Sequence, residues 1–331
     1  MSEQKKVFVI GDGGWGTANA LLLAGYGHDV TIWGAFPAYT EEMRAKGENV
    51  RFLPGVPLPA NLRLTNNAAD VKDADVVVLA PPSKYFASVM AQFTGLVTDR
   101  HLVVSLTKGL CEKTNKRMTQ LAQEILGLKD VVALAGPTHA EEVSRGIPTT
   151  IVAACAHAEK AAAVQQIWSG PRFRVYTSSD PAGVEIGGCV KNVIAIAVGC
   201  SDGMGFGDNT RAALITRGLA EMRRFVYAYG GLPETLTGLA GIGDLIVTCT
   251  SRHSRNHSVG ERLGKGEKIE EILGSMQMVA EGVWNSKVVH ELAKEFKIEM
   301  PISEVVYQAC YHGYDVRNAL AEMMTRDLKS E

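Results

Sequence analysis

The chain has 331 residues, of which 46% are hydrophobic and 21% are charged, and its formal net charge at pH 7 is −2. This composition excludes an intrinsically disordered protein, because disorder requires low hydrophobicity and high net charge. Without a basic excess, the chain also lacks the electrostatic basis for binding nucleic acid or an anionic membrane surface. The length predicts about two domains.

The cysteines and the N-terminal residues indicate the compartment. The six cysteines are widely spaced and form no Cys-x-x-Cys pair, so we expect reduced thiols rather than the disulfide framework of a short secreted chain. The residues MSEQKK lead directly into VFVIGDGG, whose four apolar residues are too few for a signal-peptide core. The longest uncharged apolar stretch, Asn192 to Ser201, is far shorter than a membrane span. We therefore expect a cytoplasmic protein with no membrane span.

Short runs rich in β-branched residues alternate with helix-like segments before residue 180. The runs are apolar throughout, which is typical of strands that are covered on both faces. A helical pattern over Lys113–Leu126 is one of the segments between them. The alternation predicts an α/β fold, with an N-terminal Rossmann-type doubly wound parallel sheet and right-handed crossovers. The predicted strands are Val7–Ile10, Val30–Trp33, Asp75–Leu79, Leu102–Ser105, Val131–Leu134, Thr149–Ala154 and Phe173–Thr177.

Long helical patterns replace the β-branched runs beyond Pro181. We expect a dinucleotide-binding Rossmann domain over residues 1–180 and a C-terminal all-helical substrate and catalytic domain over residues 181–331, with the active site in the cleft between them. Three prolines in FLPGVPLP predict a surface loop over Phe52–Pro59. The predicted helices of the second domain are Pro181–Gly199, Asn209–Tyr229, Gly282–Phe296 and Ser303–His312.

A glycine-rich motif, GDGGWG, occupies residues 11–16, directly after the first strand and before a helical pattern. This is G-x-G-x-x-G in the context that dinucleotide binding requires. Gly11 allows the tight turn, Gly13 lets the backbone approach a pyrophosphate, and Gly16 lets the helix pack closely on the strand. The phosphates then lie at the positive end of the helix. The alternative is a tight turn that binds no ligand.

The residues after the second strand leave the choice of cofactor open. That strand ends in Trp33-Gly34-Ala35-Phe36, which offers no carboxylate for a ribose 2′-hydroxyl and no arginine for a 2′-phosphate. Polar loops follow three later strands, and one of them contains Lys108 beside a glycine. Because ligands bind beyond the carboxyl ends of parallel strands, Lys108 is placed to hold an anion, unless it is an ordinary solvated loop lysine.

Two charged residues stand alone in apolar runs of the second domain. Lys191 and Glu185 are the only charges from residue 184 to residue 200, and Asp244 is the only charge from residue 236 to residue 250. A lysine in such a helix is buried with a partner, and burial lowers its pKa toward the range of proton transfer, unless its head reaches solvent at a helix end. Asp244 also needs a partner, unless it caps the helix that follows.

A polar cluster, SRHSRNH, follows at residues 251–257, and Thr248 precedes it. Two arginines among serine and asparagine donors are suited to a phosphate, because a guanidinium offers paired donors to phosphate oxygens. The alternative is a solvated polar loop. His253 and His257 have the spacing of a metal pair, but no third ligand stands in a suitable motif, so no metal is expected.

The chain as a whole resembles the bacterial NAD(P)-dependent glycerol-3-phosphate dehydrogenase family. The resemblance rests on GDGGWGTANA, SLTKGL, LAGPTHAEEVSRGIPT, the long block GVEIGGCVKNVIAIAVGCSDGMGFGDNTRAALITRGLAEM, GLAGIGDLIVTCTSRHSRN and VAEGV. The departures are Asp12-Gly13-Gly14, where the family often has a small residue and serine, Leu106 for alanine and Thr138 for serine. Ala35 stands where many members place a basic residue that meets the 2′-phosphate.

The resemblance implies reduction of dihydroxyacetone phosphate to sn-glycerol 3-phosphate with NADH or NADPH, for glycerophospholipid synthesis, and no metal. Lys191 would be the catalytic proton donor and acceptor, with Asp244 beside it as the second catalytic residue. The expected substrate-binding residues are Lys108, Gly136, Thr138, Lys191, Asp244, Thr248, Ser254, Arg255 and Asn256. The expected cofactor-binding residues are Gly11, Gly13, Gly14, Trp15, Gly16, Lys108, Ala140, Arg255, Val279 and Glu281.

Two other functions remain alternatives at this point. One is a lysine-dependent dehydrogenase of a different β-hydroxy acid or phosphorylated sugar acid, whose carboxylate would bind near Arg255. The other is a non-catalytic dinucleotide-binding regulator, although a sensor needs neither Lys191 nor Asp244. A small phosphorylated molecule is the expected ligand. The sequence does not determine the oligomeric state, and a homodimer is a candidate assembly.

Overall fold

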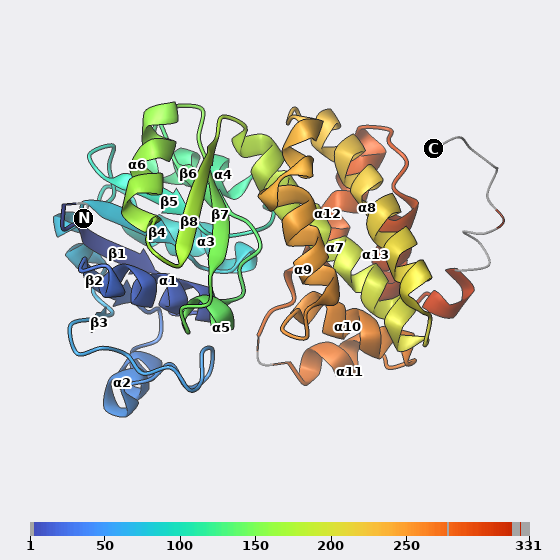
Figure 1. Ribbon diagram of the computed structural model, residues 1–331, viewed down its shortest axis with the longest axis horizontal. Coiled ribbons are helices and arrows are strands. Elements are labelled where there is room, and N and C mark those ends of the chain that lie inside the picture. Colours follow the sequence, from blue (N-terminus) through green and yellow to red (C-terminus); the bar gives the residue numbers. More distant parts are fainter. Residues whose placement is uncertain (1–2, 277, 320–324, 326–331) are drawn as a thin grey trace.

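The computed structural model describes residues 3–276, 278–319 and 325, which form a sheet-containing part and a helical part (Figure 1). Within these residues, one eight-stranded sheet has the order β3-β2-β1-β4-β5-β6-β7-β8. Its first six strands follow the order of a doubly wound dinucleotide-binding fold, as predicted. The strands are β1 (Lys6–Ile10), β2 (Asp29–Trp33), β3 (Arg63–Thr65), β4 (Val76–Leu79), β5 (Leu102–Ser105), β6 (Val132–Ala135), β7 (Thr149–Ala154) and β8 (Phe173–Ser178).

The sheet is parallel except at one pair of strands. β6 and β7 run antiparallel, whereas every other adjacent pair is parallel, so the expectation of a wholly parallel sheet is wrong at this pair. A parallel pair needs a crossover along the sheet, usually through a full helix. The connection from β6 to β7 holds only the four-residue helix α5 (Ala140–Val143) and reverses the chain direction.

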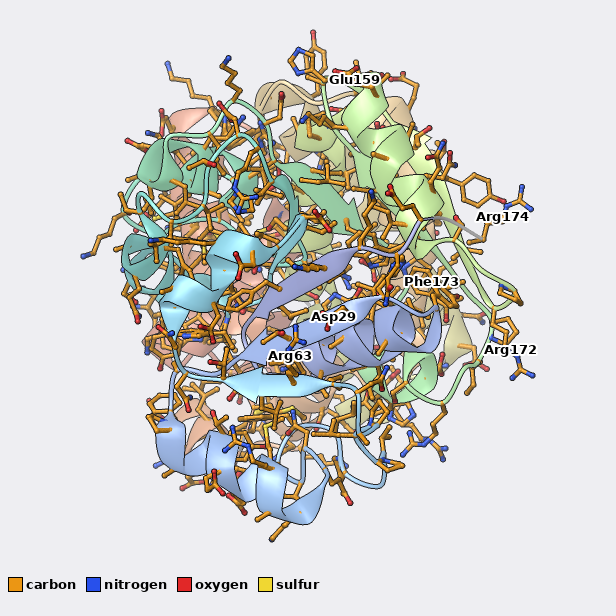
Figure 2. All side chains as sticks on the ribbon, turned by 90° about the vertical axis from the view of Figure 1, so that its left-hand side faces the viewer. Asp29, Arg63, Glu159, Arg172, Phe173 and Arg174 are labelled. Atoms are coloured by element: carbon orange, nitrogen blue, oxygen red, sulfur yellow. The ribbon has the colours of Figure 1, made fainter. Side chains whose placement is uncertain are left out.

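The edge strand β3 is an element that the sequence does not predict. It has three residues, none of them buried, and therefore no apolar run. Its Arg63 reaches β2, where Nη2 donates to Asp29 Oδ2 at 3.0 Å (Figure 2). At the opposite edge, β8 begins with buried Phe173 between exposed Arg172 and Arg174. Short, charged edges of this kind protect a sheet from pairing with another chain.

The inner strands bury both faces, as their apolar sequences predict, whereas the edge strands β3 and β8 do not. Val7 and Val9 of β1 pack into the core beneath α1 and α6, whereas Phe8 and Ile10 pack into the core beneath α3 and α4. The helices of this part are α1 (Gly14–Gly25), α2 (Pro37–Lys46), α3 (Ser83–Met90), α4 (Met118–Leu126), α5 and α6 (Ala158–Trp168), with the 3₁₀ turns η1 (Ala68–Asp73) and η2 (Ala91–Phe93).

Two local expectations need correction. α4 begins later than predicted, because the preceding residues form a turn in which the Cys111 N–H donates to Lys116 O at 2.9 Å and Asn115 has a φ of 56°. The segment Phe52–Pro59 is a loop, as predicted, but it is not wholly a surface loop. Its Leu53 and Val56 are buried against α1, so it is anchored over the start of that helix.

The helical part follows β8 directly and contains the predicted helices. β8 ends at Ser178 and α7 begins at Pro181, so the change from sheet to helix falls where the domain boundary was expected; the boundary itself stays a prediction. Residues 320–324 and 326–331 of the expected second domain lie outside the described residues. The elements are α7 (Pro181–Gly203), α8 (Asp208–Ala228), α9 (Asp244–Thr250), α10 (Arg255–Gly264), α11 (Ile269–Gly274), α12 (Glu281–Glu295) and α13 (Pro301–His312), the 3₁₀ turns η3 (Pro233–Thr237) and η5 (Val316–Asn318), and the π-helical turn η4 (Leu239–Gly243).

α7 runs through the middle of the helical part (Figure 1). Among the described residues it is the one helix long and apolar enough to cross a membrane, but 94% of its apolar window is buried inside the protein, as in a core helix. α10 crosses it at very short range. A Cβ at Gly199 would lie 2.1 Å from His257 O, and one at Gly260 would lie 2.0 Å from Ile196 O. These two glycines therefore set the position of α10 on α7.

Candidate active site

Four neighbouring strands end in a row at one edge of the sheet. In the register, Leu79 of β4 lies between Ile10 of β1 and Ser105 of β5, and β6 lies beyond β5. The loops after these strands bring together segments that are far apart in sequence, and ligands of such sheets bind beyond this edge. These loops contain the glycine motif at residues 11–16, Pro81-Pro82-Ser83, Thr107-Lys108-Gly109 and Gly136-Pro137-Thr138-His139.

Three charged side chains meet where this edge faces the helices. Asp244, the first residue of α9, accepts from Lys191 Nζ through Oδ1 and from Lys108 Nζ through Oδ2, each at 2.7 Å. Lys191 comes from the middle of α7, and Lys108 comes from the loop after β5. One carboxylate thus joins an ammonium from the sheet part to an ammonium from the helical part.

The geometry excludes the simpler explanations of these residues. The Lys191 side chain is 5% exposed, so its head does not escape to solvent at a helix end. The Asp244 side chain is 1% exposed, and Asp244 is the first residue of α9 rather than its N-cap, which is Gly243. Lys108 is 17% exposed and pairs with a buried carboxylate, so it is not an ordinary solvated loop lysine.

Burial and charge shift the pKa values of this cluster. The pKa of Lys191 is lowered to about 8, because desolvation by burial and the positive charge of Lys108 together outweigh the opposing effect of Asp244. Burial alone would raise the pKa of Asp244, but Lys108 and Lys191 outweigh it and lower that pKa. Thr248 lies one turn along α9, where its Oγ1 accepts from Lys191 Nζ at 2.5 Å and donates to Asp244 O at 2.6 Å. At neutral pH the cluster therefore holds an ionised carboxylate beside a lysine that readily exchanges a proton.

The loop after β6 completes the surroundings of Lys108. Lys108 Nζ also donates to Gly136 O at 3.0 Å, and Thr138 Oγ1 donates to the same oxygen at 3.1 Å. The structure therefore places Gly136 and Thr138 next to the charged cluster, as the resemblance implies. Substrate contacts for either residue stay a prediction.

The polar cluster at residues 251–257 forms the start of α10. Ser254 caps the helix, because its Oγ accepts from the His257 N–H at 3.2 Å. Asn256 is buried; its Nδ2 donates at 2.9 Å to Oδ1 of Asn192, the residue that follows Lys191. Arg255 points outward instead, and its Nη1 donates to Val279 O at 2.8 Å. The three residues thus stand beside the lysine helix, with Arg255 on the solvent side.

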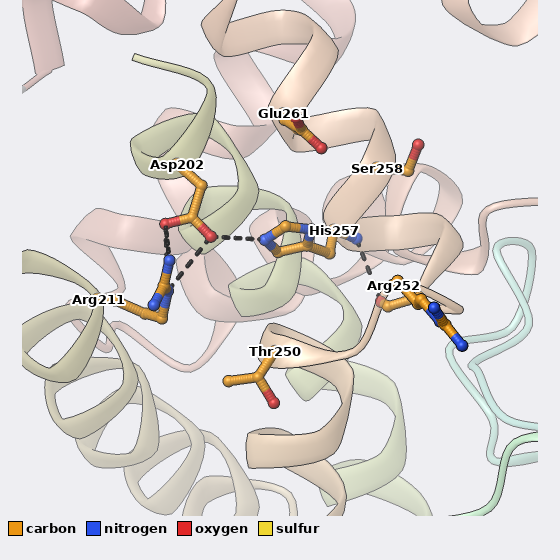
Figure 3. Close-up of a pocket in the computed structure, with 8 residues that line it drawn as sticks. Asp202, Arg211, Thr250, Arg252, His257, Ser258 and Glu261 are labelled. Carbon is orange, nitrogen blue, oxygen red and sulfur yellow. Dashed lines mark hydrogen bonds and ion pairs between the residues drawn. The ribbon is translucent and has the colours of Figure 1, made fainter. Parts of the chain in front are cut away.

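A charged network of Asp202, Arg211 and His257 stabilises the first turn of α10 (Figure 3). His257 Nε2 is 2.7 Å from Asp202 Oδ2, and Arg211 Nη2 donates to Asp202 Oδ1 at 3.0 Å. Because His257 is bound to Asp202, whereas the His253 ring packs on His139 with centroids 5.7 Å apart, the two histidines do not form a metal pair. No group of three or more metal-ligating side chains occurs in the part of the chain that the structure describes.

The glycine motif has the shape that a pyrophosphate requires. Gly11 adopts a φ of 116°, which permits the tight turn, and a Cβ on Gly16 would lie 2.3 Å from Gly11 O. A Cβ on Gly14 would lie 2.5 Å from Phe52 O. At Gly13, the N-cap of α1, nothing lies within 4 Å of a Cβ, so a ligand can approach the backbone there. The loop therefore fits a dinucleotide.

Trp15 belongs to this motif, and Ala140 lies beside it. Both are half-buried and pack against the cluster formed by Ala18, Leu53 and Val56. The anchored loop over Phe52–Pro59 thus holds them beside the start of α1. Their contact with the cofactor stays a prediction.

Two of the expected cofactor-binding residues, Val279 and Glu281, belong to the helical part. Glu281 begins α12, and its carboxylate accepts from Ser83 N at 3.2 Å and from Ser83 Oγ at 2.5 Å, at the end of β4. Burial raises the pKa of Glu281, although these two hydrogen bonds oppose the shift. Val279 O accepts from Arg255. No pattern in the sequence points to either residue without the resemblance.

Other residues of the site escape sequence reasoning. His139 follows Thr138, and its Nε2 is buried with no hydrogen-bond partner among the described residues. Burial and the charge of Lys191 lower its pKa. Asn192 and Ser83 act through contacts with residues that are distant in sequence. The only signal in the sequence was their position: Asn192 follows Lys191, and Ser83 lies shortly after a strand.

Comparison with known proteins agrees with this geometry. The chain matches the family model "NAD-dependent glycerol-3-phosphate dehydrogenase N-terminus" over residues 6–161 and the corresponding C-terminus model over residues 180–321. It is 46% identical to the glycerol-3-phosphate dehydrogenase [NAD(P)+] of Chlorobium limicola, over 98% of this chain and 99% of that protein. The crystal structure of the Coxiella burnetii glycerol-3-phosphate dehydrogenase superposes with a TM-score of 0.93 at 37% identity, covering 98% of this chain and 99% of that one.

The relationship extends over both parts of the molecule rather than over the glycine motif alone. The Desulfitobacterium hafniense glycerol-3-phosphate dehydrogenase [NAD(P)+] is 45% identical over 98% of this chain and 93% of that protein. The matched residues thus include the sheet edge, the lysine helix and the start of α10. The chain belongs to the NAD-dependent glycerol-3-phosphate dehydrogenase family.

Proposed function

We propose that this protein reduces dihydroxyacetone phosphate to sn-glycerol 3-phosphate with NADH or NADPH, reversibly, and so supplies glycerophospholipid synthesis. The observation that carries the proposal is the cluster of Lys108, Asp244 and Lys191 at the edge where the cofactor loop also lies. A dinucleotide-binding regulator has no need of two lysines buried on one carboxylate. The family membership supports the same conclusion.

Lys191 is the proton donor in this proposal. Its Nζ holds a proton that the low pKa makes available, and transfers it to the substrate oxygen that becomes the 2-hydroxyl group of the product. In the reverse direction the neutral amine takes that proton back. A reduced nicotinamide bound beside this cluster would supply the hydride for the carbonyl carbon.

Asp244 and Thr248 hold Lys191 in place for this transfer. Asp244 fixes the ammonium from one side, and Thr248 Oγ1 accepts a second of its three protons. The third direction of the tetrahedral ammonium is left for the substrate oxygen. Lys108, bound to the other oxygen of Asp244, adds positive charge close to the developing alkoxide.

The phosphate of the substrate is assigned to the start of α10. Arg255 offers paired donors, Asn256 a side-chain amide, and Ser254 the cap of the helix, whose N-terminus favours an anion. The support is that Asn256 contacts Asn192, the neighbour of Lys191, so the start of α10 packs against the segment of α7 that carries the lysine. Gly11, Gly13, Gly14, Trp15, Gly16, Ala140, Val279 and Glu281 are the proposed cofactor contacts.

A steady-state assay tests the proposal directly. Purified protein with dihydroxyacetone phosphate should oxidise NADH or NADPH, and the product should be identified as sn-glycerol 3-phosphate. Parallel assays with β-hydroxy acids and phosphorylated sugar acids serve as the comparison. Turnover of one of these, without turnover of dihydroxyacetone phosphate, would overturn the assignment. The cytoplasmic location stays a prediction, and the homodimer stays a candidate assembly.

A further inference from the structure

One carboxylate of the glycine motif has no partner in the structure. Asp12 Oδ2 is buried and makes no hydrogen bond within the described residues. A Cβ on Gly34, the residue that follows β2, would lie 2.6 Å from this oxygen, so the carboxylate lies directly against the end of β2. Burial raises the pKa of Asp12, and only its own backbone N–H acts in the opposite direction. A buried polar atom that is left unpaired in this way needs a ligand or a functional explanation.

The position of this carboxylate suggests its role. In dinucleotide-binding folds, an acidic residue at the end of the second strand accepts a hydrogen bond from the adenosine ribose 2′-hydroxyl. Here β2 is followed by Gly34-Ala35-Phe36, which offers no acid. Asp12 reaches the same place from the loop after β1, and Gly34 leaves it the necessary space. We propose that Asp12 accepts the ribose 2′-hydroxyl and makes the protein prefer NADH to NADPH.

Neighbouring side chains hold the backbone of Asp12 in place, and none of the described residues forms a hydrogen bond with its Oδ2 atom. Asn49 Nδ2 donates to the main-chain oxygen of Asp12 at 2.8 Å and to Thr17 Oγ1 at 2.7 Å, which fixes the backbone of the loop. Thr40 Oγ1 lies equally close to the Cβ position of Gly34, but it already accepts from Asn66 Nδ2 at 2.7 Å. Asp12 therefore offers the unpaired acceptor at the end of β2.

The cations of this region are already paired. Arg51 lies over the Tyr39 ring, and its Nη2 donates to Glu42 Oε2 at 2.6 Å. Arg44 pairs with Glu41 and donates to Leu64 O. A 2′-phosphate would therefore place its negative charge beside Asp12, and both of these arginines are already paired. Like charges placed together are strongly unfavourable.

Binding measurements test the inference without catalysis. It rests on the proposed function only through the dinucleotide site, so calorimetric titrations of the full chain with NADH and with NADPH, without substrate, are sufficient. The wild-type protein should bind NADH at least about tenfold more tightly than NADPH. Asp12→Asn, which keeps the side-chain shape and removes the charge, should weaken NADH binding, strengthen NADPH binding and bring the two dissociation constants within about threefold.

Arg51→Gln is the matched control in the same region. It should leave the ratio of the two dissociation constants unchanged, because Arg51 is bound to Glu42. Equal affinities in the wild type, an equal loss of both in Asp12→Asn, or a change of ratio in Arg51→Gln alone would each overturn the inference. A protein that binds NADH selectively but does not turn over dihydroxyacetone phosphate would overturn the proposed function and leave this inference standing.

Discussion

Replacing Lys191 by alanine should remove the proton donor while leaving the cofactor site intact. A group with a pKa of about 8 is about nine-tenths protonated at pH 7, so the wild-type site carries the proton it needs for reduction. In Lys191→Ala the proton must come from water. Loss of a positioned general acid typically costs about 10²–10⁴ in rate, or about 3–5 kcal/mol of transition-state stabilisation. We therefore expect kcat to fall at least about a hundredfold.

The effect on folding must be measured alongside. Breaking a buried ion pair costs about 3–5 kcal/mol when the remaining charge is left alone. In Lys191→Ala, however, Lys108 still neutralises Asp244, so we expect a cost at or below the lower end of that range. Lys191→Met fills more of the space on α7 without restoring the proton. Folding is checked by thermal unfolding of both variants.

The assay separates chemistry from binding. Steady-state kinetics with dihydroxyacetone phosphate gives kcat and KM, and a titration with NADH gives the cofactor dissociation constant, which should change little because the glycine motif lies in the other part of the molecule. Lys265→Ala, at the exposed residue that follows α10, is the control and should keep wild-type turnover. A folded Lys191→Ala protein with kcat within tenfold of the wild type would refute the role of Lys191.

Three further predictions concern the same site. Asp244→Asn should lower kcat, and together with Lys191→Ala the loss in a double-mutant cycle should be smaller than the product of the single losses; simple multiplication would show independent roles. Arg255→Lys should raise the KM for dihydroxyacetone phosphate at least about tenfold, because a lysine cannot reproduce the guanidinium fork, whereas Arg252→Lys should not; an unchanged KM would remove Arg255 from the phosphate site. Reduction requires protonated Lys191 and oxidation requires the neutral amine, so the reduction rate should fall and the oxidation rate should rise through pH about 8. Flat pH–rate profiles in both directions between pH 7 and 9 would contradict that assignment.

Lys191 and Asp244 could be identified from the sequence because each is a charge that an apolar run must bury. The pattern also indicates that each needs a partner, either the other residue or a shared ligand, because a buried ammonium and a buried carboxylate cannot stay unpaired. The participation of Lys108 in the same cluster does not follow, because 136 positions separate it from Asp244 and only the folded chain joins them. The alternation of strands and helices likewise predicts the sheet, whereas nothing in the β7 sequence fixes its antiparallel direction.

Residues whose importance lies in a tertiary contact remain invisible to sequence patterns. Glu281 contacts Ser83, 198 positions earlier, and no sequence motif marks either residue. Asp12 shows the same limit in another way. The motif that contains it was recognised, and the missing acid after β2 was noticed, but the connection between the two requires the distance from Asp12 to Gly34. Patterns along the chain report burial and periodicity; they do not report which buried atoms lack a partner.

The arrangement of two lysines on one carboxylate explains why the Lys191 pKa lies close to neutral pH. Without Asp244, burial would strip the proton from Lys191, because an isolated ammonium is poorly tolerated in an apolar helix. With Asp244 alone, a closed ion pair would hold that proton firmly. Lys108 shares the carboxylate and repels the second ammonium, which lowers the Lys191 pKa again. A proton donor works best when its pKa is near the working pH. The contact of Lys108 with Asp244 therefore adjusts the pKa of Lys191. Displacing Lys108 should raise that pKa and make Lys191 a weaker acid.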